Sequence, residues 1–236
     1  MIRKWTAWIV FVMSILLLFT ACSSKEPENT PITESEPVLT QTQSEEPQDT
    51  QITIESKNPN EKLSAQTVEN VKDMLPVLDS IIRSMIASEG VYAPEDASFF
   101  WSTLYLTAVN FGVQLEIAEV TEDGLIMADR QAVQEIASAF FEDNRKLLNI
   151  PAELSQTVIY DQRTDAYMFS ASDIGDSFSE VTGVSAQEDL LSVTVTLKSG
   201  DEEQAYLFVL TENLNWQVFA EPIFYYTVID AKMLDE

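Results

Sequence analysis

Apolar residues recur at three- and four-residue spacing in three stretches of the chain, and each stretch predicts a helix. The first stripe covers residues 68–85, and Pro76 inside it should kink or split the helix near Leu75. The second helix starts at residues 94–96, ends at Gly112 and is apolar nearly all round, which predicts a central place in the core. Asp129 can cap the third helix, whose apolar stripe covers residues 133–141, and Pro151 ends this helical region.

A two-residue alternation of apolar and polar side chains predicts strands elsewhere. Residues 113–118 alternate, and the turn signal Asp123-Gly124 should return the chain into a partner strand at residues 125–128. After Pro151 the pattern is entirely that of strands, which we predict at residues 157–161, 166–170, 178–185, 190–198, 204–211 and 216–229. One apolar and one polar face, with short turns, indicate an antiparallel meander, so the fold class is α+β: two or three N-terminal helices packed on a sheet.

The order helix, helix, hairpin, helix and then antiparallel strands, over residues 63–236, resembles the cone fold of proteins similar to nuclear transport factor 2. A cystatin-like sheet wrapped on a helix is the alternative. The resemblance lies in the order of elements, and it implies a ligand pocket between sheet and helices.

The N-terminal segment has a different pattern. Arg3 and Lys4 precede an apolar run at residues 5–19, which is shorter than the roughly 20 residues that a membrane-spanning helix needs. This is the layout of a cleaved signal peptide, here residues 1–21. The run ends in Ala21-Cys22-Ser23, which resembles the lipobox of bacterial lipoproteins over residues 1–24. The resemblance implies cleavage before Cys22, a diacylglyceryl group on its sulfur, and an extracytoplasmic protein that is lipid-anchored to the cell membrane. An ordinary secretory signal with a cysteine by chance is the alternative.

Residues 22–62 then form an acidic segment with several prolines and no aromatic side chain. Such a segment buries too little apolar surface to offset the loss of chain entropy, which predicts disorder. As a flexible coil it would span about 35 Å and lift a single domain, residues 63–236, away from the lipid surface.

Charge and residue types limit the chemistry. The net charge of −26 argues against binding to nucleic acid. The chain has no histidine and a single cysteine, so the triads built on histidine and zinc sites built on histidine or cysteine are excluded, and no cofactor is expected. Carboxylates remain: Asp161, Asp165, Asp173 and Asp176 lie near two predicted turns, and Asp173 and Asp176 are weak candidates for a Ca²⁺ site. Aspartate is also an ordinary turn residue, and solvated turns are the alternative.

Aromatic side chains give the other candidate site. Exposed rings can stack on sugars or hold a peptide, and the candidates are Trp101, Tyr105, Trp216, Tyr225 and Tyr226. Packing of these rings in the core is the alternative.

These observations favour a surface-displayed lipoprotein whose non-catalytic domain binds a protein, a carbohydrate or another small molecule. A structural or assembly role in the cell envelope is the first alternative. The second is an enzyme that depends on carboxylates, such as a glycosidase, which needs two of them facing one substrate.

Overall fold

The computed structural model describes residues 53–54, 63–141, 146–171, 175–216 and 222–235, and for residues 53–54 it describes the backbone alone. All of these residues belong to one compact unit, Gln48–Glu236. Cys22 and the signal segment lie outside the described residues, as do Asp173 and all of the predicted tether except residues 53–54. No helix in the described part of the chain is both long and apolar enough to cross a membrane.

The first predicted helix is split, as Pro76 indicated. Helix α1 covers Ala65–Asp73 and helix α2 covers Leu75–Ala87, with Met74 between them and the proline in the first turn of α2. Proline is tolerated there because the amide at that position has no partner within the helix. The break redirects the chain, so that α2 is largely buried while Val71 is the one buried residue of α1.

Helices α3 and α4 complete the helical layer. Helix α3 covers Ala97–Phe111, and the Asp96 carboxylate caps it by accepting hydrogen bonds from the amides of Ser98 and Phe99, each at 2.9 Å. Helix α4 covers Arg130–Phe140. Asp129 occupies the N-cap position of α4 as predicted, but its side chain makes no capping hydrogen bond. A short 3₁₀ helix, η1, follows at Ala152–Leu154.

The described strands form two sheets, which confirms the α+β fold class but divides the predicted strands. One sheet has the order β2-β3-β5-β4 and is built from two hairpins. Its strands are β2 (Glu119–Val120), β3 (Ile126–Asp129), β4 (Val158–Asp161) and β5 (Ala166–Phe169). The other is the predicted meander, with the order β6-β7-β8-β9. Its strands are β6 (Phe178–Gln187), β7 (Leu190–Ser199), β8 (Glu202–Glu212) and β9 (Tyr226–Met233).

A fifth strand joins the meander from the predicted tether. Strand β1, Thr53–Ile54, pairs in parallel with β6, where Thr53 lies opposite Gly183 and Ile54 opposite Val184. The prediction that residues 22–62 lie wholly outside the folded domain is therefore wrong at this point. An open sheet edge presents unpaired amide and carbonyl groups, which even a two-residue strand can satisfy.

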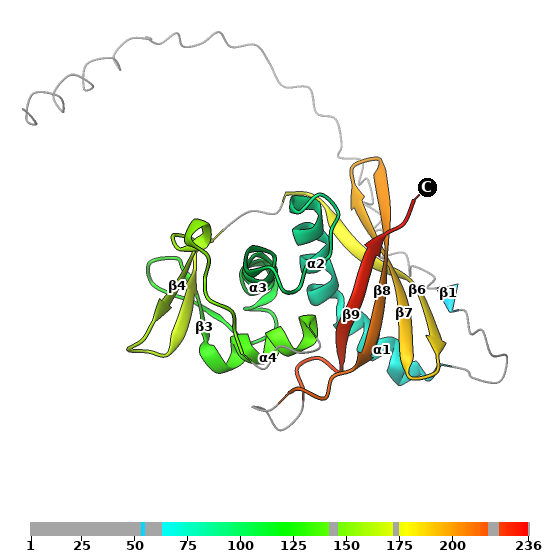
Figure 1. The fold of residues 1–236 in the computed structure, drawn as a ribbon, viewed down its shortest axis with the longest axis horizontal. Helices are drawn as coiled ribbons and strands as arrows, with labels where there is room; N and C mark the ends of the chain where they lie inside the picture. The colour runs from blue at the N-terminus through cyan, green and yellow to red at the C-terminus, as the bar shows by residue number, and fades with distance from the viewer. Residues whose placement is uncertain (1–52, 55–62, 142–145, 172–174, 217–221, 236) are drawn as a thin grey trace, which may run out of the picture. The chain divides into compact units, whose positions relative to one another are not determined.

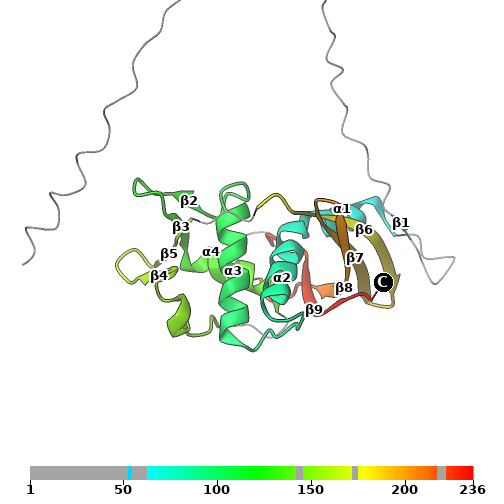
Figure 2. The same ribbon diagram turned by 90° about the horizontal axis from the view of Figure 1, so that it is seen from above.

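Helices α2, α3 and α4 lie between the two sheets (Figure 1; Figure 2 from above). Helix α3 contacts β3 and β5, α2 contacts β6 and β7, and α4 contacts strands of both sheets. The buried apolar residues of the helices and of both sheets form one continuous core cluster. The central place predicted for the second helix is confirmed, since Phe99, Phe100 and Trp101 are all buried.

Two predicted strands are wrong in their bounds. Residues 112–116 form turns, and Glu116 has a φ of 57°, so the alternation at 113–118 does not become a strand. The last strand begins at Tyr226 rather than at residue 216, and residues 217–221 lie outside the described part. At residues 113–118 the side chains alternate in the sequence, but the backbone turns instead of pairing with a strand.

Candidate functional site

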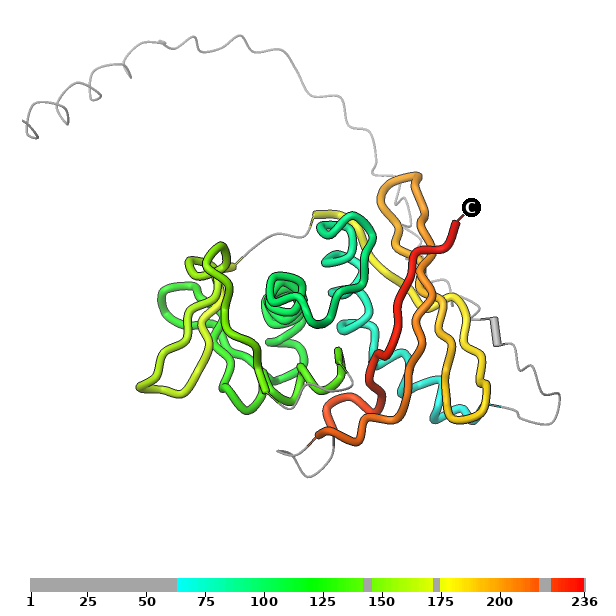
Figure 3. Tube along the Cα trace, in the orientation of Figure 1, coloured from blue at the N-terminus to red at the C-terminus, as the bar shows by residue number. Residues whose placement is uncertain are grey.

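A groove of about 720 Å³ lies at one end of the meander. Three parts of the chain line it: the start of α1, the turn between β6 and β7, and the described residues at the end of β8 and the start of β9. Figure 3 traces the backbone of these parts. We call it the acidic groove. It is lined by Leu63, Ser64, Thr67, Asn70, Ala186, Glu188, Asp189, Leu191, Thr211, Glu212, Leu214, Tyr225 and Tyr226.

The first wall of the acidic groove is the N-terminal turn of α1. Ser64 is the N-cap of α1, and its hydroxyl accepts a hydrogen bond from the amide of Thr67 at 2.9 Å. One turn further on, Gln66 donates to the amide oxygen of Asn70 at 2.7 Å. This wall therefore presents short, uncharged hydrogen-bonding side chains in a locally fixed arrangement.

The second wall carries charge. Glu188 and Asp189 form the two-residue connection between β6 and β7, and both side chains are exposed. Glu188 has a φ of 56°, in the left-handed region that glycine adopts most easily. A tight two-residue hairpin connection ordinarily needs a residue in this region, where a non-glycine residue costs about 1 kcal/mol or more.

The third wall brings the two predicted tyrosines together. Tyr226 pairs with Glu212 across β8 and β9, and the amide of Asn213 donates to the carbonyl oxygen of Tyr225 at 2.9 Å. Asn213 is buried, and its side chain donates to Ser138 in α4 and to the carbonyl oxygen of Phe224. These bonds fix the segment that carries both rings.

The two rings differ in exposure. The side chain of Tyr225 is 42 % exposed, whereas Tyr226 is half-buried. Burial raises the pKa of Tyr226, hydrogen bonds to Thr67 and Asn70 act in the opposite direction, and the charge of Glu212 raises it further. The Tyr226 hydroxyl is therefore protonated at neutral pH.

The other aromatic candidates do not line this groove. Trp101 is fully buried, its ring N–H donates to the carbonyl oxygen of Leu148 at 3.0 Å, and its ring packs against Tyr167. Tyr105 donates to the carbonyl oxygen of Ser170 and packs against Phe169. Trp101 therefore has no surface with which to contact a ligand, and core packing, the alternative, describes it. Tyr105 is half-buried outside the acidic groove, and its role in ligand binding stays a prediction. Trp216 is half-buried and lies outside β9.

The aspartates considered for calcium have other partners. Asp161 pairs with Arg163 at 3.3 Å, and Asp165 with Arg130 at 2.8 Å. Asp176 is exposed, while Asp173 lies outside the described residues. Among the described residues, no cluster of three or more acidic, histidine or cysteine side chains could hold a metal ion.

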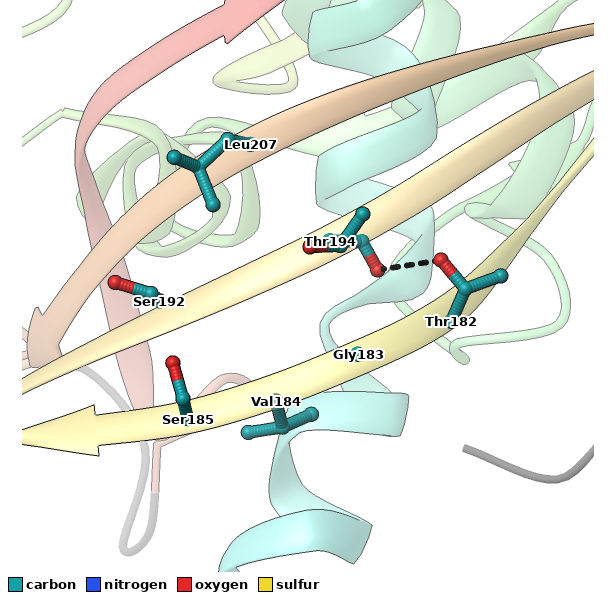
Figure 4. Close-up of a pocket in the computed structure, with 7 residues that line it drawn as sticks. All are labelled: Thr182, Gly183, Val184, Ser185, Ser192, Thr194 and Leu207. Atoms are coloured by element: carbon teal, nitrogen blue, oxygen red, sulfur yellow. Dashed lines mark hydrogen bonds between the residues drawn. The ribbon is translucent and has the colours of Figure 1, made fainter. Parts of the chain in front are cut away.

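A second, smaller groove of about 210 Å³ lies on the outer face of the meander (Figure 4). Hydroxyl side chains line most of it, and Thr182 donates to the carbonyl oxygen of Thr194 at 3.4 Å. It lies at Gly183 and Val184, where β1 pairs with β6 and where the register of β6 against β7 shifts. Its described lining contains neither a charged nor an aromatic side chain, so it offers fewer means of recognising a ligand than the acidic groove.

The sequence therefore identified two lining residues of the acidic groove, Tyr225 and Tyr226, and missed the three carboxylates. A signal was present in Glu188-Asp189, two acidic residues between two alternating stretches. Glu212 carried no such signal, because only the pairing of β8 with β9 brings it beside Tyr226.

No family model, curated protein or solved structure matches this chain. The resemblances to the lipobox and to the cone fold remain predictions.

Proposed function

We propose that this protein is a lipoprotein, anchored through Cys22 to the outer face of a cell membrane, whose folded domain binds a ligand without catalysis. The anchor is supported by the apolar run at residues 5–19 followed directly by Ala21-Cys22-Ser23. The acidic segment that follows would serve as a spacer between the lipid and the domain.

The acidic groove is the observation that carries the binding role. It combines two tyrosine rings with hydrogen-bonding and apolar side chains in about 720 Å³ of open volume, which is within the size range of ligand sites. Aromatic rings supply large contact area with little loss of side-chain freedom on binding, since each ring has few rotatable bonds.

A photo-cross-linking experiment in intact cells tests this proposal. A photoreactive residue replaces Leu214, which lines the acidic groove and is 76 % exposed. The matched control replaces Ile159, which is 48 % exposed on the other sheet. We expect a discrete adduct at position 214, no such adduct at position 159, and loss of the adduct when Tyr225→Ala is added.

Two results would contradict the proposal. The absence of any adduct at position 214 would mean that the groove is not occupied in the envelope. An adduct at position 159 alone would instead favour the assembly role, with the outer face of the β2–β5 sheet as its contact surface.

A further inference from the structure

The acidic groove has an uneven distribution of charge. Glu188, Asp189 and Glu212 line it, and none of the described lining residues is basic. The register that pairs Leu191 with Leu210 brings the Glu188–Asp189 turn to the same end of the sheet as Glu212. The carboxylates therefore act on one region of space.

One feature of the groove favours an anion. The N-terminus of α1 lies in its wall and carries a partial charge equivalent to about +0.5. The Ser64 hydroxyl already accepts one of the amide hydrogens at this N-terminus. The three carboxylates of the groove outweigh the partial positive charge that remains there. The groove therefore favours a cation.

The tyrosines are suited to the same kind of ligand. The face of an aromatic ring attracts an ammonium or a guanidinium group. Tyr225 is exposed enough to receive one, and Tyr226 lies opposite Glu212 in the sheet, so a cation there would meet a ring and a carboxylate together.

The uncharged part of the lining distinguishes a peptide from a simple polyamine. Ser64, Thr67, Asn70 and Thr211 offer donors and acceptors, which match the amide groups of a polypeptide backbone. Leu63, Leu191 and Leu214 offer apolar contact for neighbouring side chains. A polyamine has no acceptor group and would leave much of this lining unmatched.

We propose that the acidic groove binds an extended peptide segment whose arginine or lysine side chains alternate with small or apolar ones. The cationic side chains contact Glu188, Asp189 and Glu212 and stack on Tyr225, while the peptide backbone lies along the start of α1. This inference rests on the proposed function, because it takes the groove to be the ligand site.

Binding of a defined peptide to the full-length protein in non-ionic detergent tests the inference. The probe is a fluorescent ten-residue peptide in which arginine alternates with alanine, read by anisotropy against protein-free micelles. A peptide with glutamate in place of arginine and free spermidine serve as comparison ligands. Each is measured at low and at moderate salt, because ion pairs at an exposed site weaken with ionic strength.

Two triple variants separate the groove from the general acidity of the protein. The groove variant carries Glu188→Gln, Asp189→Asn and Glu212→Gln. The control variant carries Glu95→Gln, Glu122→Gln and Glu202→Gln, three exposed carboxylates outside the groove lining. Both variants lose the same charge, and unchanged thermal unfolding shows that each is folded.

We expect the arginine peptide to bind the wild type and the control variant with affinities within about twofold of each other. The groove variant should bind about tenfold more weakly or worse, since each exposed ion pair contributes about two- to fivefold. The glutamate peptide should not bind.

Equal weakening in both triple variants, or no weakening in either, would overturn the inference. So would failure of the arginine peptide to bind the wild type, or its displacement by spermidine as effectively as by unlabelled peptide. Failure of the inference is distinguishable from failure of the proposed function. If the adduct at position 214 persists in the groove variant, the groove holds a ligand of another chemistry. If position 214 gives no adduct in the wild type either, the groove is not a ligand site.

Discussion

At the scale of single residues, a buried ion pair in α2 joins the helices to the meander. Asp79 in α2 is buried, and it accepts hydrogen bonds from Arg83 at 2.7 Å and from Ser179 in β6 at 2.6 Å. Arg83 also donates to the hydroxyl and the carbonyl oxygen of Ser177, each at 2.9 Å. This pair joins α2 to the start of the meander.

Removing one member of that pair should be costly. Asp79→Ala leaves the guanidinium of Arg83 buried without its counterion, and we expect the free energy of unfolding to fall by about 3–5 kcal/mol in urea unfolding experiments. Asp161→Ala is the matched control, because Asp161 pairs with an Arg163 side chain that is 90 % exposed. This substitution should lower the free energy of unfolding by less than about 1 kcal/mol. Equal losses in the two variants would show that burial of the Asp79 pair contributes nothing.

Glu188 should show a conflict between stability and binding. Glu188→Gly relieves the positive φ, so we expect it to raise the free energy of unfolding by about 1 kcal/mol. It also removes a groove carboxylate and should weaken binding of the arginine peptide. Asp189→Gly is the matched control, because Asp189 is not among the described residues with positive φ; it should weaken binding without the gain in stability. A stability gain in both variants would contradict the assignment of strain to Glu188.

At the scale of elements, the connections decide how helices and sheets meet. The turn after α3 brings Gly112 against the preceding helical turn, with the amides of Ile117 and Ala118 both donating to its carbonyl oxygen. A second connection ties the β4–β5 hairpin to the start of α4. There Asp165 accepts hydrogen bonds from Arg130 and Tyr160, and its carbonyl oxygen accepts one from the amide of Arg130.

Gly112 is needed for lack of space rather than for an unusual backbone, since its φ is −57°. A Cβ atom there would lie 2.3 Å from the carbonyl oxygen of Ala108 and 2.9 Å from the Cβ atom of Ala118. We therefore expect Gly112→Ala to lower the free energy of unfolding by about 1–3 kcal/mol in urea unfolding experiments. Adding Ala118→Gly should restore part of that loss, and no restoration would contradict the contact with Ala118.

The Asp165 cluster should make the hairpin contact sensitive to acid. Hydrogen bonds from Arg130 and then from Tyr160 lower the pKa of Asp165 below its ordinary value of 3.8. A carboxyl group whose pKa is lower in the folded state stabilises the protein above the unfolded-state pKa and loses that effect as the pH falls through the folded-state pKa. The wild type should therefore be more stable than Asp165→Asn at pH 7, and the difference should shrink in urea unfolding at about pH 2.5. A difference that is independent of pH would contradict this.

At the scale of the whole molecule, the sequence combines a lipoprotein-like N-terminus with one acidic domain. The described part, within Gln48–Glu236, shares a single core between two sheets. The net charge of −26 produces a negative field, which would steer a basic segment of a partner towards the surface and the acidic groove.

The proposed anchor gives a direct prediction for location. Cys22→Ala removes the only thiol in the chain and hence the only cysteine that could carry the lipid. We expect the protein to move from the membrane fraction to the soluble fraction, because the remaining chain has no acyl group to bury. Ser23→Ala is the matched control and should stay with the membrane. Unchanged membrane fractionation of Cys22→Ala would contradict the lipoprotein assignment.

The sequence by itself determined the helices, most of the strands and the fold class. Helical and strand periods, the Pro76 break and the hairpin signals depend on neighbouring residues along the chain, and so they could be read without the tertiary structure. The division of the strands between two sheets, the pairing of β1 and the burial of Trp101 depend on contacts between distant segments, which periodicity does not encode. The acidic groove is of the same kind, since Asn70, Glu188 and Tyr226 meet only because the start of α1 and one end of each of the strands β6 to β9 lie at one place. Only the tertiary structure decided that these side chains share one surface.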